Sequence, residues 1–497
     1  MSLPDAPGLT RRRCCAGLIA GLGVLATGGC AAVSREEQRI GRAEAEEVER
    51  TVGLVRDPRL VGYIEAIGRR LIKAAGPADI AWQWNVADEP APNAFAVPGG
   101  WVYLTRGLLA LANREDEVAG VLAHEMAHVI ERHSVRQAGA AAPLAVLFGV
   151  PSGILGMVSP TLGGIVGGAG RLVAGLALAP YSREQEREAD RIGVTLAARA
   201  GWDPGALGGF LGVLERAEAV SGTATPGRQS FFATHPSTPE RMATIEALAR
   251  SAPRASEPPM AASRPAFLGR IEGLVIGDNA AHGVFVGPLF LHADLDLALE
   301  IPAAGWTTAN NPRAAGAVAP EQAAAVLLQV VGSGSDPVAG ARADGLTEPQ
   351  IAKLRRFQIS GLPAADLAAT TRDRMYVDLT WIAHRGRIFR VTGVCHETDR
   401  ARYRPIFERT AATFRPLRSE DRTRIVESRL RIRSARSGET VAEVVSRSGA
   451  TWPPPLAAVA NGVSLDRKLE AGWPVKISVT ERYRPAPVPA PANRPSG

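Results

Sequence analysis

The segment His124-Glu125-Met126-Ala127-His128 constrains this chain more than any other. In a helix, residues four positions apart lie one turn apart on the same face, so His124 and His128 would project together. Two imidazoles placed in this way can bind one Zn²⁺, and Glu125 can hold a water molecule beside the metal. The spacing therefore predicts a zinc site with Glu125 as the general base.

The residues around this segment are typical of a well-capped helix. Thr105 is predicted to cap a short helix that runs to Ala112, and Asn113 to cap the helix that carries the two histidines. Acidic residues occupy positions 115–117, in the first turn, where the helix dipole favours them. His133 lies outside the ligand spacing and is predicted to be a surface residue.

A third zinc ligand is predicted in the charged helix at residues 181–200. Glu186 and Asp190 are four positions apart, so Glu186 can bind the metal while Asp190 accepts the free N–H of a ligating histidine, His124. Glu188 competes for the ligand assignment, but only Glu186 pairs with Asp190 at helical spacing. A solvated acidic face is the alternative for this segment taken alone. The expected site holds one Zn²⁺ per chain and leaves its fourth position to water.

The first thirty residues predict export from the cytosol. A basic cluster at residues 11–13 precedes an uncharged, mostly apolar run that ends in Gly28-Gly29-Cys30. This order is typical of a bacterial signal peptide, and the small residues before Cys30 resemble a lipobox, in which Cys30 carries a lipid. Plain cleavage is the alternative. We expect a periplasmic protein that is anchored to the outer membrane as a lipoprotein.

The net charge of +7 comes largely from residues 400–436, which hold twelve arginines and four acids. Neither interleaved aromatic residues nor a nucleic-acid-binding motif accompanies them, so no nucleic-acid partner is expected. A solvated surface, or one that faces anionic envelope polymers, explains the arginines better. Three of the four cysteines lie in the signal segment, which leaves Cys395 without an intradomain disulfide partner.

The segments beside the zinc helices have distinct patterns. Residues 58–75 predict an amphipathic helix, residues 80–86 a strand, and residues 93–104 two short strands joined by a Pro-Gly-Gly turn. The free edge of such a strand could hold an extended peptide over the metal, although an ordinary hairpin explains the pattern equally well. Residues 137–170 carry no charge and are interrupted by prolines. They predict an apolar lid or membrane-touching loop rather than a membrane span.

Three motifs together resemble the Ste-twenty-four/HtpX/Oma-like gluzincins of peptidase family M forty-eight, in particular the periplasmic BepA-like and LoiP-like branch. They are HEMAH at 124–128, EREADRIG at 186–193 and THPSTPERM at 234–242, and the resemblance covers residues 56–248. It implies that His124, His128 and Glu186 bind zinc and that Glu125 is the base. It also implies that His235 can reach the metal and occupy the water position. An ordinary loop histidine is the alternative for His235.

The rest of the chain is expected to form further units. A Pro/Ala/Ser-rich linker at 251–265 separates the peptidase domain (35–250) from an α+β domain at 266–420, with helices at 347–357 and 402–413. Residues 429–480 predict a strand, two helices and a strand, with Ser437 capping the first helix. They resemble a LysM module, which binds the glycan of peptidoglycan, and a structural cap is the alternative. Residues 481–497 form a Pro-rich tail.

The sequence thus predicts an α+β multidomain protein. A mainly helical gluzincin domain with a small edge sheet precedes an α+β domain and a βααβ LysM-like module. The expected activity is that of a zinc metalloendopeptidase of the bacterial envelope. Its expected substrates, misfolded or misassembled envelope proteins, are implied by the resemblance alone. The alternatives are a latent protease that acts as an envelope chaperone or scaffold, and a peptidoglycan-directed hydrolase.

Overall fold

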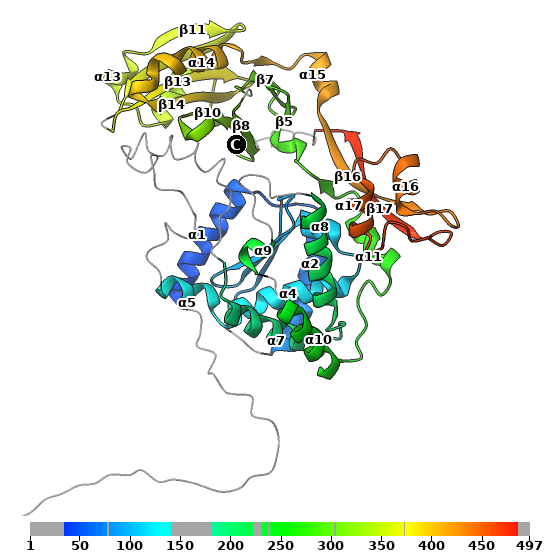
Figure 1. Ribbon diagram of the computed structural model, residues 1–497. Helices are drawn as coiled ribbons and strands as arrows, with labels where there is room; N and C mark the ends of the chain where they lie inside the picture. Colours follow the sequence, from blue (N-terminus) through cyan, green and yellow to red (C-terminus); the bar gives the residue numbers. More distant parts are fainter. Residues whose placement is uncertain are drawn as a thin grey trace, which may run out of the picture.

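A computed structural model describes residues 34–76, 79–140, 180–221, 231–236, 239–302, 305–371 and 373–485. The fold mixes helices and sheets and is organised as several units (Figure 1). The predicted signal segment with Cys30 and most of the predicted apolar loop, from residue 141 onward, lie outside the described residues. Among the described helices, none combines the length and the apolarity needed to cross a bilayer.

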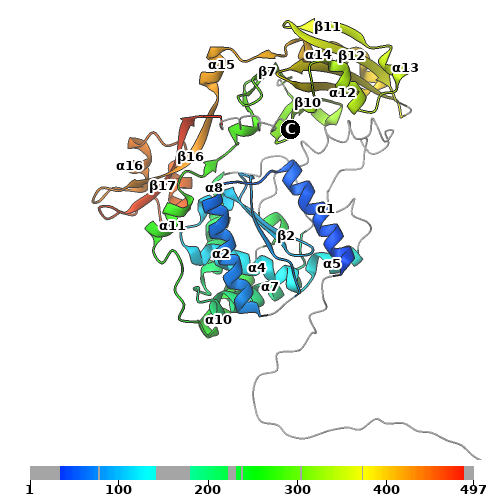
Figure 2. The same cartoon turned by 180° about the vertical axis from the view of Figure 1, so that it is seen from behind.

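The N-terminal unit is a small sheet packed between helices, as the two opposite views show (Figures 1 and 2). The strand order is β1-β3-β2, with β1 parallel and β2 antiparallel to β3. One face, which includes Phe95 and Tyr103, packs on α1, and the other, which includes Val102 and Leu104, packs into the main core. The elements are α1 (Arg35–Thr51), α2 (Pro58–Ala75), β1 (Gln83–Ala87), β2 (Ala94–Val97), β3 (Trp101–Thr105), α3 (Arg106–Leu111), α4 (Glu115–Ile130), α5 (His133–Ala140), α7 (Arg183–Arg199), α8 (Ala206–Ser221), α9 (Phe231–Thr234) and α10 (Pro239–Ser251).

The hairpin of β2 and β3 is confirmed, and its turn requires glycine. Gly99 and Gly100 have φ values of +87° and +109°, a region that other residues rarely adopt. Helix α1 passes so close to this turn that a Cβ on Gly41 would lie 1.7 Å from the Pro98 carbonyl oxygen. Strand β2 forms the edge of the sheet, and among the described residues no further strand pairs with it. The zinc-motif helix α4 packs against this same strand.

The central unit is a seven-stranded antiparallel sheet in the order β11-β12-β13-β14-β10-β9-β8. Alternate residues of β13 enter two cores, with Tyr376 and Ile382 facing α14 and Val377 and Trp381 facing α12. A smaller sheet, β15-β7-β6-β5, lies beside it. The elements are η1 (Ala280–His282), β5 (Val284–Val286), β6 (Leu289–His292), β7 (Leu297–Glu300), β8 (Thr307–Asn311), β9 (Ala314–Val318), η2 (Pro320–Gln322), β10 (Ala324–Ser333), α12 (Pro337–Ala343), α13 (Glu348–Ile351), β11 (Arg355–Ile359), β12 (Leu362–Thr370), β13 (Met375–His384), β14 (Arg387–His396), η3 (Glu397–Asp399), α14 (Arg400–Ala412), β15 (Arg415–Pro416) and α15 (Ser419–Arg424).

One helix predicted for this unit is wrong. Residues 347–357 do not form a single helix, because α13 ends at Ile351 and strand β11 begins at Arg355. Arg355 and Phe357 pair with Asp366 and Ala364 of β12, so sheet pairing outweighs the local helical pattern. The other predicted helix is confirmed as α14, and Phe407 on it packs against Gly393 of the sheet.

The C-terminal unit has the predicted order of strand, helix, helix and strand. Its elements are β16 (Val426–Ser434), α16 (Val441–Arg447), α17 (Pro454–Ala460) and β17 (Pro474–Arg482). Strand β16 pairs with β17 and also with β4 (Val275–Ile276), which follows α11 (Arg264–Ile271). Thr440 caps α16 through Glu443, so the prediction of Ser437 as the cap is wrong. Strand β17 extends to Arg482, beyond the predicted start of the tail.

This unit packs tightly on the N-terminal one. Its apolar side chains, among them Val444, Ala457 and Ile477, belong to the same buried cluster as the residues of α2, α4 and α8. Lys476 is fully buried, and its ammonium donates to the carbonyls of Ala110 (2.9 Å) and Ala112 (2.6 Å) at the end of α3. The module therefore binds the chain directly before the zinc-motif helix.

The predicted linker also lies against the N-terminal unit. Arg70 donates to the carbonyls of Glu257 (2.6 Å) and Pro258 (2.7 Å). The carboxylate of Glu115, the first residue of α4, accepts from the backbone N–H groups of Met260 (2.8 Å) and Ala261 (2.5 Å). Glu115 lies in the first turn of α4, where the helix dipole favours an acid. It thus also binds the segment that leads to the C-terminal half.

Replacing Lys476 by methionine should weaken this docking. Lys476→Met keeps a long side chain but leaves two buried carbonyls without their donor. We expect the free energy of unfolding to fall by about 2–4 kcal/mol, since each unsatisfied buried acceptor costs about 1–3 kcal/mol. Urea denaturation of the full chain measures it. Lys468→Met, at a lysine that is 66% exposed on the same module, is the control. Equal stability of the two variants would show that the Lys476 contacts do not stabilise the fold.

Candidate metal centre

Helix α4 carries His124, Glu125 and His128 in its buried middle. All three side chains are at most 1% exposed. The helix begins differently from the prediction, because Arg114 occupies the N-cap position and forms no side-chain cap. The amide of Asn113 instead donates to the carbonyls of Leu111 and Ala460, and its backbone N–H donates to Glu117. The predicted cap residue therefore connects α4 to the C-terminal module.

Helix α7 brings the acidic residues to this helix. Ser182 and Gln185 form a capping box at its start, which fixes the first turn that contains Glu186. The two helices cross closely at Gly193, where a Cβ would lie 3.0 Å from the backbone of His124. This close crossing sets Glu186 and Asp190 against His124.

Four side chains converge at one point. The Nε2 atoms of His124 and His128 lie 3.0 Å apart. His124 Nε2 lies 3.6 Å from Glu186 Oε2, and His128 Nε2 lies 3.4 Å from Glu186 Oε1. His235 Nδ1 lies 2.9 Å from Glu186 Oε1. One possible ligand atom from each of the four residues lies within 4.8 Å of the others.

His235 enters the site from the end of α9. Its backbone N–H donates to the Phe231 carbonyl, and its ring stacks on the Phe231 ring at 4.4 Å. Its Nε2 atom lies 3.5 Å from Glu125 Oε1. The side chain is completely buried, so it differs from an exposed loop histidine.

Asp190 and Arg241 support the ligand cluster from behind. Asp190 Oδ1 lies 3.0 Å from His124 Nδ1, on the side of the ring opposite the cluster. Arg241 of α10 donates to both Asp190 oxygens, at 2.6 and 2.9 Å, and lies 2.5 Å from Glu186 Oε2. Sequence reasoning gave Arg241 no role, although it lies inside the THPSTPERM motif.

His133 is not a surface residue, contrary to the prediction. It is fully buried, and its Nδ1 atom is hydrogen-bonded to His128 Nδ1 at 2.8 Å. On its other side, Nε2 is hydrogen-bonded to Glu188 at 3.1 Å. Glu188, the competing ligand candidate, is absent from the convergent group of four and contacts His133 instead.

Burial and the neighbouring charges set the ionisation of the site. Burial raises the pKa of Glu125. Burial and the charges of neighbouring imidazoles hold the pKa of His128 well below its usual range. Burial opposes ionisation of Glu186, but His235, His128 and His124 outweigh it and hold the pKa of Glu186 well below its usual range. A neutral imidazole beside an ionised carboxylate is the state that a metal requires of its ligands.

The unpaired atoms of the site fit a metal ion. Both Glu125 carboxylate oxygens and His235 Nε2 are buried, and among the described residues none of them has a hydrogen-bond partner. Such atoms are costly in a protein interior unless something binds them. Imidazole and carboxylate donors suit Zn²⁺, and a cation with an attached water would satisfy them. His124, His128 and Glu186, with His235 in reach, are the residues that would hold it.

Comparison with known proteins agrees with this geometry. The model of the family described as "Peptidase family M48" matches residues 58–249. The domain formed by residues 58–249 belongs to peptidase family M48. The resemblance seen in the sequence is thereby confirmed, and the match includes α4, α7, α9 and nearly all of α10.

Curated relatives match part of this chain. The "Mitochondrial metalloendopeptidase OMA1" of Schizosaccharomyces pombe is 35% identical over 187 residues, which cover 37% of this chain and 51% of that protein. The "Beta-barrel assembly-enhancing proteases" of Yersinia pestis and Escherichia coli are 34% and 31% identical, and each match covers 35% of this chain and 37% of the relative. This chain thus spans about half or less of the length of these relatives.

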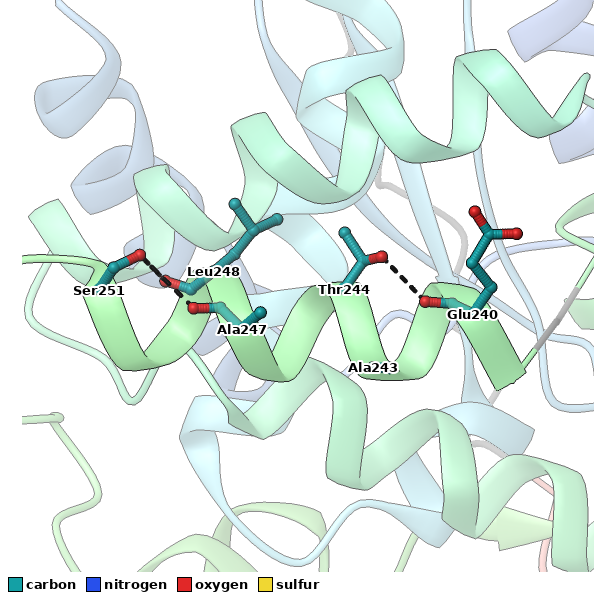
Figure 3. Close-up of a pocket in the computed structure, with 6 residues that line it drawn as sticks. All are labelled: Glu240, Ala243, Thr244, Ala247, Leu248 and Ser251. Carbon is teal, nitrogen blue, oxygen red and sulfur yellow. Dashed lines mark hydrogen bonds between the residues drawn. The ribbon is translucent and has the colours of Figure 1, made fainter.

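Other candidate positions carry less chemistry. His282, His292, His384 and His396 are absent from any group of three or more metal-ligating residues among the described ranges. A surface hollow of the M48 domain runs along α10 (Figure 3). The hydroxyls of Thr244 and Ser251 that line it already donate their hydrogens to carbonyls of the same helix.

Replacing Arg241 by methionine should destabilise the metal-free M48 domain. Arg241→Met removes the cation between two buried carboxylates, which costs about 3–5 kcal/mol when one partner of a buried pair is lost. Added Zn²⁺ should recover part of this loss, because it supplies positive charge to Glu186. Thermal unfolding with and without Zn²⁺ measures both effects. Arg250→Met, at an exposed arginine of the same helix, should behave as the parent protein does. A loss unaffected by zinc would contradict the electrostatic explanation.

Proposed function

We propose that this protein is a zinc-dependent metalloendopeptidase in which Glu125 is the general base. The observation that carries this proposal is the position of Glu125 at the convergent ligand group. Its carboxylate is fully buried, is free of hydrogen bonds from the described residues, and lies on the same helix as two of the ligands. Among the described residues, its one ion-pair contact is with His235 Nε2 at 3.5 Å, so no hydrogen bond explains its burial.

The residues of the site divide the chemistry between them. Bound Zn²⁺ would polarise the scissile carbonyl and lower the pKa of the attacking water. Glu125 takes the proton from that water and returns it to the leaving amine, which makes it both general base and general acid. His124, His128 and Glu186 act as ligands, and Asp190 orients the His124 ring through Nδ1.

His235 bears on whether the resting site is active. Its Nδ1 atom shares the Glu186 oxygen that lies closest to His128, so it can supply a fourth protein ligand where a catalytic site would hold water. We propose that the protease is latent until the His235 side chain leaves this position. A chaperone or scaffold with a permanently closed metal site is the second candidate, and the same contact favours it.

The substrate and the location remain part of the proposal. Two of the relatives are named for enhancing β-barrel assembly, which supports misfolded or misassembled envelope proteins as substrates. The edge strand β2, which packs on α4, could hold such a chain in extended form. The signal segment supports a periplasmic location with a lipid anchor at Cys30, and the βααβ order of the C-terminal module supports contact with peptidoglycan.

Glu125→Gln should separate metal binding from catalysis. The amide keeps the shape of the side chain but cannot accept the proton, so casein cleavage should fall by about 10²–10⁴-fold, the usual contribution of general acid–base catalysis. The zinc content, measured by atomic absorption, should equal that of the parent protein. A variant that retains both zinc and activity would exclude Glu125 as the base.

His235→Ala distinguishes a latent protease from the other candidates. Faster casein cleavage by this variant than by the parent, at equal zinc content, is the result expected of a latent enzyme. Cleavage by neither protein at full zinc occupancy would favour the scaffold. Release of soluble fragments from purified peptidoglycan, without peptide cleavage, would favour the third candidate, a peptidoglycan hydrolase.

A further inference from the structure

A second chain of contacts leads away from the ligand cluster through His128. His128 presents Nε2 to Glu186 and Nδ1 to His133, with the two Nδ1 atoms 2.8 Å apart. His133 Nε2 then meets Glu188 Oε2 at 3.1 Å. These contacts form a continuous line, from the proposed metal ligand to a carboxylate that is 33% exposed at the surface.

The backbone places His133 for this contact. Helix α4 ends at Ile130, and Arg132 adopts a left-handed φ of +56°, which turns the chain before α5 begins. Gln185 of α7 donates to the His133 carbonyl at 3.2 Å, so the main chain of His133 is attached to the helix that carries Glu188. The His133 side chain is 0% exposed, so it is held inside the protein and does not extend into solvent.

Hydrogen-bond chemistry allows one arrangement of protons along this line. A ligand imidazole must offer a lone pair to the metal, so His128 must carry its proton on Nδ1. His133 Nδ1 must then accept a hydrogen bond from this N–H. The proton of His133 is therefore on Nε2, which donates a hydrogen bond to Glu188. A carboxylate at the end of such a line therefore fixes the tautomers of both imidazoles.

The two proposed ligand histidines are thus supported in different ways. His124 meets Asp190 directly, whereas His128 reaches its carboxylate through a second imidazole. The ring of Tyr181 also stacks on His128, with centroids 3.8 Å apart, and its hydroxyl is hydrogen-bonded to Ser134. His128 is therefore held at one edge by His133 and over one face by Tyr181.

We propose that His133 and Glu188 are positioning residues that hold His128 in the tautomer and orientation required to bind the metal. This inference rests on the proposed zinc site, and it assigns a role to two residues outside the ligand set. Neither residue contacts the reacting atoms. Their effect should appear first in metal affinity and not only in turnover.

Substitutions at His133 separate hydrogen bonding from packing. His133→Phe fills the same space without an acceptor and should weaken Zn²⁺ binding by about 10–100-fold, as loss of an outer-shell partner commonly does. His133→Asn places an amide oxygen where Nδ1 stood and should restore most of the affinity. Competition with a chromogenic chelator measures the dissociation constant of Zn²⁺ from the full chain. Unfolding of the metal-free proteins reports whether the fold is intact.

Substitutions on α7 provide an independent test. Glu188→Ala removes the final acceptor and should weaken Zn²⁺ binding, whereas Glu184→Ala, at an exposed acid one turn away, should not. This pair decides the question if His133→Phe fails to fold. Equal affinity of Glu188→Ala and Glu184→Ala would overturn the proposal. Equal weakening of Zn²⁺ binding by His133→Phe and His133→Asn would also overturn it, since packing alone would then explain the effect.

The outcome is distinguishable from failure of the proposed function. If the parent protein binds no zinc, the function itself is wrong. If the parent binds zinc and cleaves casein while His133→Phe binds Zn²⁺ equally well, only the positioning role is wrong.

Discussion

The close packing of α7 on α4 is the contact on which the site depends. It places the Glu186 and Asp190 carboxylates in a protein interior, beside Glu125, where isolated charges are strongly disfavoured. Arg241 and the surrounding imidazoles compensate for this burial. The charges of the cluster therefore stabilise one another, and the cluster draws residues from α4, α7 and α10 together with His235, which follows α9.

The same requirement explains the residues behind the ligands. A buried imidazole has two nitrogen atoms, and each needs a partner. Asp190 serves His124 and is itself held by Arg241, so this side of the cluster ends in a buried ion pair. The His128 side ends in Glu188, which is partly exposed. One side of the site is thus closed within the core, and the other is connected to the surface.

Much of this arrangement could be predicted from sequence, because it depends on local spacing. Helix α2 has the predicted bounds, and Thr105 caps α3 as expected. The convergence of His124, His128 and Glu186 follows from two helical motifs that must meet at one metal. The features that escaped prediction depend on tertiary contacts. Burial of His133 requires the left-handed turn at Arg132, and the role of Arg241 requires a contact across 51 residues.

The start of α4 shows why local patterns can also mislead. Asn113 is a good cap in isolation, but its amide holds a carbonyl 347 residues away in the C-terminal module. Lys476 and Arg264 add contacts at the same point, and Glu117 receives the backbone N–H of Asn113. A displacement of the module would leave the Asn113 amide and the carbonyls of Ala110 and Ala112 without these partners directly before the helix of His124. These contacts end directly before α4, the continuous helix from Glu115 to Ile130 that carries His124 and His128, so the C-terminal module is connected to the candidate site through the start of this helix.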